Sequence, residues 1–132
     1  MKTAVAVLIV CFASIAPMAS AQEKMEAFMT STTPEERAQM QTDHMKQTLT
    51  LTENQLPQVQ EINLKYARKM QDAYNGGGSR LQKLKRVKGV SQEKDKELKR
   101  VLTSTQYATY ESNKEEMKEK MRERAKERMK TN

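Results

Sequence analysis

Apolar side chains recur at three- and four-residue steps between positions 56 and 73, with polar or charged residues between them. This spacing gathers the apolar residues on one face of an α-helix and does not fit the alternation of a β-strand. It therefore predicts a helix over 53–75. The apolar face consists of Leu56, Val59, Ile62 or Asn63, Tyr66, Met70 and Ala73.

Similar spacing and helix-start signals predict further helices on both sides of this one. A helix over 34–48 begins at Pro34, and residues 22–32 before it are expected to form a loose turn. Three consecutive glycines, 76–78, end the helix over 53–75. A short helix over 79–88 follows.

Gly89 is expected to interrupt this helix, and a further helical segment reaches Val101. The last helix begins near Ser104 and continues toward Met129, with the charged stretch 111–132 expected to be solvated or to face a partner. The pattern therefore predicts an all-α fold, and the length after residue 21 suits a single domain over 22–132.

One five-residue pattern, Leu-Thr-x-x-Gln, opens two of these helices, 51 residues apart. Thr followed three residues later by Gln is a capping box, in which the Thr hydroxyl accepts from the backbone N–H of the Gln and the Gln side chain accepts from that of the Thr. A third box begins at Thr33. The repeated pattern predicts architecture, not catalysis. Its residues are Leu51, Thr52 and Gln55 in one copy and Leu102, Thr103 and Gln106 in the other.

The first 21 residues have the pattern of a cleaved signal peptide. Lys2 precedes an apolar stretch over 4–16 that is too short to span a bilayer, and Ala19-Ser20-Ala21 is a suitable cleavage site. We expect an exported protein that begins at Gln22 and has no transmembrane segment after cleavage. Cleavage removes Cys11, the only cysteine, which excludes disulfides and thiolate metal sites in the mature protein.

Core-forming residues are scarce in the expected mature chain. Its 111 residues contain 13 Val, Ile and Leu together with Phe28. This share is below the roughly 20% found in well-packed domains. Eight Met and four Tyr compensate in part. A homodimer that shares one thin core is therefore expected.

Charge is segregated along the sequence. Residues 22–64 carry 3 basic and 7 acidic side chains, whereas residues 65–100 carry 12 basic and 4 acidic ones. The basic block suits acidic protein segments or anionic lipid headgroups. Nucleic acid is not expected, because the protein is exported and no aromatic residue interrupts the run from 80 to 88. The candidate binding residues are Lys65, Arg68, Lys69, Arg80, Lys83, Lys85, Arg86 and Lys88.

Catalytic chemistry has little support in the sequence. His44 is the only histidine, and no Ser or Cys motif resembles a nucleophile elbow. We expect no enzyme and no cofactor. Met40 and His44 lie four residues apart on one helix face and could ligate Cu(I). Methionine at an adaptable binding surface is the alternative reading of the same residues.

The paired Leu-Thr-x-x-Gln motifs, in an exported and Met-rich helical chain, resemble the LTXXQ-motif family of bacterial periplasmic proteins, the Spy/CpxP-like proteins. The resemblance covers roughly residues 34–125, with the two motifs as its anchors. It implies long, antiparallel, bent helices in a helical hairpin that forms a cradle-shaped homodimer. Gly76–Gly78 and Pro57 depart from this pattern. These departures affect the expected shape of the cradle more than the expected helical class.

For function, the resemblance implies an ATP-independent periplasmic chaperone that binds unfolded clients on a basic, Met-containing surface. It also implies an envelope-stress sensor kinase as a possible partner. Two alternatives remain open at this point. One is a metal-responsive binder or sensor for copper or zinc, and the other is a structural envelope protein that binds anionic surfaces.

Overall fold

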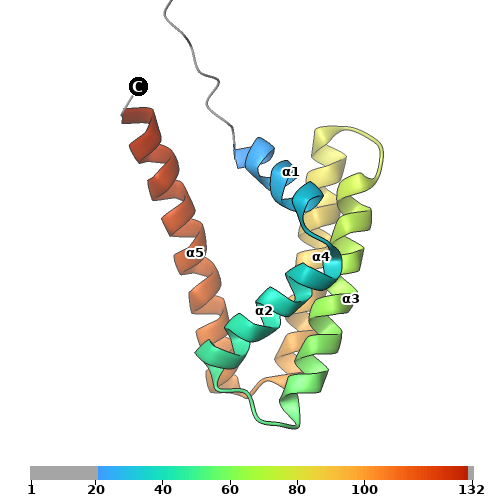
Figure 1. Cartoon of the computed structure of the whole chain (residues 1–132), viewed down its shortest axis with the longest axis vertical. Helices are drawn as coiled ribbons and strands as arrows, with labels where there is room; N and C mark the ends of the chain where they lie inside the picture. Colours follow the sequence, from blue (N-terminus) through green and yellow to red (C-terminus); the bar gives the residue numbers. More distant parts are fainter. Residues whose placement is uncertain (1–20, 131–132) are drawn as a thin grey trace, which may run out of the picture.

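The computed structural model describes residues 21–130, with the side chains of 26–116 and Lys130 (Figure 1). This part of the chain forms five α-helices and no β-strand, which confirms the all-α prediction. The helices are α1 (Ala21–Ser31), α2 (Pro34–Leu49), α3 (Gln55–Asn75), α4 (Arg80–Val101) and α5 (Ser104–Lys130). The predicted signal peptide lies outside the described residues except for Ala21. Between residues 21 and 130, no helix is long and apolar enough to cross a bilayer.

Helices α3 and α4 run antiparallel as a hairpin, and α2 packs against α3. Figure 1 shows α5 leaving the base of the hairpin and diverging from it, so that the molecule has the outline of a V. Helix α2 crosses between the two arms and reaches the start of α5. Its contacts with both α3 and α5 connect the arms near the closed end of the V.

The hydrophobic core lies toward this closed end, where α2, α3 and α4 meet the start of α5. Val59 and Leu98 are completely buried, with 0% of each residue exposed. Leu51 and Tyr107 are partly buried and pack against the same core. Burying these side chains is the main contribution that holds the arms together. The core consists of Met45, Leu49, Val59, Ile62, Tyr66, Leu98 and Leu102.

Both Leu-Thr-x-x-Gln motifs form the predicted capping boxes. The Gln55 backbone N–H donates to Thr52 Oγ1 at 3.2 Å, and the Thr52 N–H donates to Gln55 Oε1 at 3.1 Å. The corresponding distances between Thr103 and Gln106 are 3.2 Å and 3.0 Å. The box at Thr33 is also present and opens α2. These three helix starts are therefore determined locally, as the sequence indicated.

The prediction of a loose turn over 22–32 was wrong, because this stretch is helix α1. Two contacts hold its C-terminal end. The Met29 side chain is buried, and Arg37 Nη1 donates to the carbonyl oxygens of Met29 at 3.4 Å and Thr32 at 2.7 Å. The hydrogen bonds come from Arg37 of α2, so the sequence of 22–32 alone did not reveal them.

The predicted break at Gly89 was also wrong, because α4 continues through it from Arg80 to Val101. A glycine inside a helix costs only about 1 kcal/mol relative to alanine. Packing of α4 along α3 compensates for this cost: Leu98 is fully buried and Val90 packs against the core. The predicted break at 76–78 is confirmed, since α3 ends at Asn75 and Ser79 caps α4.

Candidate functional site

A groove opens between the two arms of the V, with a volume of about 860 Å³. All five helices contribute to it. Helix α2 crosses it, α3 and α4 form one wall, and the first turns of α5 form the other. Phe28 and Met29 of α1 close one end. The lining residues of α4 are Arg80, Lys83, Leu84, Val87, Val90, Ser91 and Lys94, which follow one another at helical steps along a single face.

Most of the groove wall is apolar. Helix α2 contributes Met45 and Leu49, and α4 contributes Leu84 in addition to its valines. Leu84 is 56% exposed, and Phe28, at the end of the groove, is 43% exposed. An apolar surface of this size, concave and open to solvent, is typical of a binding site for an apolar partner. Helix α3 contributes Tyr66, Ala67, Met70 and Tyr74.

Among the described side chains, every lining residue that carries a full charge is basic, and no aspartate or glutamate lines the groove. Lys83 lies over the ring of Tyr74, with Nζ 4.6 Å from the ring centre. The Lys114 ammonium forms an ion pair of 2.6 Å with Asp95, which stands behind the lining residues. The groove therefore combines apolar walls with positive charge. Its basic residues are Arg37, Arg80, Lys83, Lys94 and Lys114.

Two of these cations, Arg37 and Lys94, differ in how they are bonded. Arg37 is 4% exposed and structural, since its guanidinium donates to Gln71 Oε1 at 2.6 Å as well as to the end of α1. Lys94 is half-buried, and its Nζ donates to Gln41 Oε1 at 2.6 Å. Burial lowers the pKa of the Lys94 ammonium to about 8, because desolvation disfavours the charged form. The charge of Lys114 acts in the same direction, and that of Asp95 opposes it.

Only two of the eight cations proposed from the sequence, Arg80 and Lys83, line the groove. The three on α3 form ion pairs with neighbouring helices. Their distances are 2.5 Å for Lys65–Glu97, 2.9 Å for Arg68–Glu35 and 3.0 Å for Lys69–Glu93. Such exposed pairs are typically worth about 0–1 kcal/mol each. They remain accessible, but most of their charge is compensated within the chain.

The other three cations proposed from the sequence lie on α4 and do not line the groove. Arg86 stabilises the glycine turn, since its Nη2 donates to the carbonyl oxygens of Gly76 and Gly77, both at 2.9 Å. Lys85 and Lys88 are exposed. The basic residues of α4 therefore fall into three groups. Arg80 and Lys83 line the groove, Arg86 holds the turn between α3 and α4, and Lys85 and Lys88 lie on the outer surface.

Sequence reasoning missed Lys94 and Lys114 as groove residues. The signal for Lys94 was present, because Val87, Val90, Ser91 and Lys94 share one face of a continuous helix. The break expected at Gly89 hid this face by placing its two halves on separate segments. Lys114 had no comparable signal, because its position depends on how α5 meets α2 and α4.

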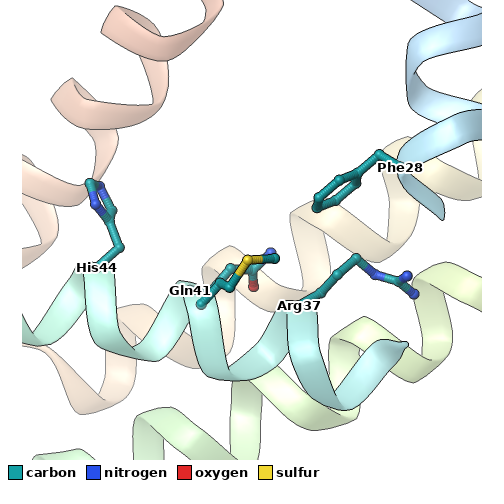
Figure 2. A pocket seen from close by; sticks show the side chains of 5 residues that line it. Phe28, Arg37, Gln41 and His44 are labelled. Carbon is teal, nitrogen blue, oxygen red and sulfur yellow. The ribbon is translucent and has the colours of Figure 1, made fainter. Parts of the chain in front are cut away.

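Met40 and His44 line a shallow pocket of about 230 Å³ on α2, together with Phe28, Arg37 and Gln41. Figure 2 shows Phe28 and His44 at opposite ends of this pocket, with Gln41 between them. The positive charge of Arg37 does not favour a cation here. Among the described side chains, no three His, Cys, Asp or Glu residues come together as a possible metal site.

The fold and this site define a small, all-helical protein with an open, apolar groove whose charged lining residues are basic. The chain belongs to the family described as a domain of unknown function, DUF4890, which matches residues 19–110. This match includes every groove residue except Asn113 and Lys114. No curated protein and no solved structure matches the chain. Membership of the LTXXQ-motif family stays a prediction.

Proposed function

We propose that this protein is an ATP-independent chaperone of the bacterial periplasm that holds segments of unfolded clients in its groove. One observation carries the proposal: the groove of about 860 Å³ has apolar walls, and its fully charged lining residues are all basic. Unfolded clients expose apolar side chains, which the groove can cover. Its positive charge attracts the acidic segments of a client and accelerates the encounter.

The character of the walls suits clients of varied sequence. Met70, which is partly exposed, has a flexible, polarizable side chain that adapts to partners of different shape. Tyr74 offers an aromatic face, and Leu84 is already half exposed. A chaperone that binds many clients weakly needs this adaptability more than it needs one tightly complementary shape.

The proposal includes export to the periplasm and a homodimer. Export rests on the signal-peptide pattern of residues 1–21, and the dimer rests on the scarcity of core-forming side chains in the sequence. An envelope-stress sensor kinase as partner rests on the LTXXQ resemblance alone. Sedimentation of the mature protein at several concentrations tests the dimer separately from the chaperone activity.

The central experiment follows the light scattered by an aggregating client after dilution from denaturant, without nucleotide and with an equimolar amount of this protein. We expect suppressed aggregation at low and moderate salt, with weaker suppression as salt screens the basic groove. If scattering is unchanged at both salt concentrations, the chaperone proposal is wrong.

Two leucines on α4 provide a matched pair of variants. Leu84 lines the groove and is 56% exposed, whereas Leu81 is 61% exposed and does not line it. Because both side chains are largely exposed, replacing either with Gln should change stability little. We expect Leu84→Gln to weaken suppression and Leu81→Gln to leave it unchanged. Equal effects of the two substitutions would place client binding outside the groove.

A metal-responsive function is the second candidate, supported by the shared pocket of Met40 and His44. It requires binding of Cu(I) or Zn(II) tighter than about micromolar, the range of a specific biological site. His44→Ala and Met40→Ala would each abolish that binding. Calorimetric titration distinguishes the two functions, because the chaperone proposal needs no metal.

A further inference from the structure

Lys94 is a half-buried cation of the groove, and no carboxylate among the described side chains pairs with it. Its Nζ makes one hydrogen bond, to the neutral Gln41 Oε1, and within the described side chains it forms no ion pair. Both acidic residues next to it in the sequence, Glu93 and Asp95, are already engaged in other contacts. Asp95 accepts from the Tyr110 hydroxyl at 2.9 Å and from Lys114 Nζ at 2.6 Å.

Arg37 provides the contrast within the same groove. It too lacks a carboxylate partner, but its guanidinium has four acceptors, on Met29, Thr32 and Gln71. An ammonium has three N–H donors. Lys94 uses one of them within the protein while facing an apolar groove. A cation that has lost part of its hydration gains strongly from a charged hydrogen-bond acceptor.

We propose that Lys94 selects the segments that the groove binds, by pairing with an Asp or Glu carboxylate of a client whose neighbouring apolar side chains fill the groove. This inference rests on the proposed function and names its substrate class: acidic-apolar peptide segments. The carboxylate occupies the free donor positions of the ammonium. Leu84, Val87 and Val90, which lie on the same face of α4, contact the apolar part of the segment.

Several features favour a peptide segment with carboxylates over an uncharged apolar ligand. Arg80 and Lys83 line the same groove and form no ion pair among the described side chains, so the local field favours negative charge near them as well. The lowered pKa of Lys94 indicates that its ammonium is poorly compensated in the free protein. A bound carboxylate supplies the missing compensation, whereas an amide side chain of the same shape does not.

The test uses two labelled peptides that share a sequence rich in Leu and Met and differ only at two positions, which are Glu in one and Gln in the other. Fluorescence anisotropy measures the binding of each peptide to the mature protein at pH 7. We expect the wild type to prefer the Glu peptide by about tenfold, the effect of one charge-assisted hydrogen bond. Lys94→Met should lose most of this preference, and the remainder comes from Arg80 and Lys83 at the edge of the groove.

Lys96→Met is the matched control, because it removes the same charge from an exposed position of α4 that does not line the groove. It should retain the preference for the Glu peptide. If Lys94→Met retains the preference as well, the inference is wrong, although the chaperone proposal stands as long as both peptides bind. If neither peptide binds and the wild type does not suppress aggregation, both proposals fail.

A lipid ligand would give a different result. Vesicles containing anionic lipid provide this arm of the experiment. If wild type and Lys94→Met bind such vesicles equally well and more tightly than either peptide, the groove is not a site for acidic peptide segments and the inference is overturned.

Discussion

Gln55 and Gln106 hydrogen-bond to each other through both atoms of their side-chain amides. Gln55 Nε2 donates to Gln106 Oε1 at 2.7 Å, and Gln106 Nε2 donates to Gln55 Oε1 at 3.0 Å. Gln55 also donates to the carbonyl oxygen of Val101, the last residue of α4, at 3.1 Å. Gln106 donates to the carbonyl oxygen of Leu49, the last residue of α2, at 3.3 Å. The two motifs therefore join the ends of α2 and α4 to the starts of α3 and α5.

This pairing predicts that the two glutamines contribute jointly to stability. Gln55→Ala and Gln106→Ala should each lower the free energy of unfolding by about 1–3 kcal/mol, because each leaves polar groups of a part-buried network without partners. In the double variant the loss should be smaller than the sum of the single losses by about 1 kcal/mol. Urea unfolding at one fixed protein concentration measures all four proteins.

Glu36→Ala supplies the control for this cycle, because it breaks the capping box of α2, which is not part of the glutamine network. Its effect should add to that of Gln106→Ala within about 0.5 kcal/mol. If the losses in the free energy of unfolding caused by Gln55→Ala and Gln106→Ala also add within about 0.5 kcal/mol, the paired amides make no cooperative contribution.

Gly89 offers a second test of stability. A Cβ added there meets no atom within 4 Å, and the residue lies inside the continuous helix α4. Gly89→Ala should therefore raise the free energy of unfolding by about 0.5–1 kcal/mol, since alanine loses less backbone entropy than glycine on forming a helix. Urea unfolding measures the change.

Gly78→Ala is the comparison for Gly89, with the opposite sign expected. Gly78 has a φ of +100°, and an added Cβ would collide with the Gln82 side-chain oxygen that accepts from the Ser79 N–H. Stability should therefore decrease. A loss of stability in Gly89→Ala as well would indicate that α4 bends or opens at Gly89 in solution.

These residues show how far the sequence leads. Helix starts such as Thr52 and Thr103 could be predicted, because a capping box is formed by residues three positions apart. The continuity of α4 through Gly89 could not, because it depends on packing against α3. The basic residues that the sequence offered as candidates for binding divide in the same way. The sequence predicted that Lys65 is available to bind a partner, but this residue forms an ion pair with Glu97, 32 positions away. Lys94 shares the groove-lining face of α4 with Val87 and Val90 because the helix is continuous through Gly89.

Tyr66 predicts a loss of stability at alkaline pH. Burial raises the pKa of its phenol to about 12, and the hydrogen bond of 2.8 Å that it donates to Glu97 acts in the same direction. Above pH 10 the unfolded chain releases this proton while the folded protein retains it. The stabilisation is therefore complete below pH 10 and is lost as the pH rises toward 12.

Tyr66→Phe isolates this effect. The variant lacks the hydrogen bond to Glu97 and should be less stable than the wild type near neutral pH. Between pH 10 and 12, the stability of the wild type should fall more steeply, by up to about 1.4 kcal/mol per pH unit. Tyr110, whose pKa is also raised, and Lys94 contribute equally to both proteins. Parallel pH profiles would mean that Tyr66 ionises freely in the folded state.

Lys94 predicts that the affinity for acidic segments depends on pH. Its pKa of about 8 in the free protein should rise when a carboxylate binds, because the anion stabilises the ammonium. The affinity for the Glu peptide should therefore change little between about pH 6 and 7, where the Glu carboxylates are ionised, and decrease as the pH rises through 8, until the ammonium of the complex also loses its proton. Binding near pH 8 should take up protons.

Other titratable groups near this lysine require a control. They are Asp95 on α4, Lys114 and Tyr110 on α5, His44 on α2, and Tyr66 and Tyr74 on α3. Any pH dependence that they cause persists in Lys94→Met, so the difference between wild type and variant belongs to Lys94.

Calorimetry at pH 8 in buffers of different ionisation enthalpy measures the proton uptake directly. Uptake should occur with the Glu peptide and the wild type only, because the Gln peptide lacks the carboxylate of the pair and the Lys94→Met variant lacks its ammonium. Equal uptake with both peptides would show that the protons bind elsewhere in the protein.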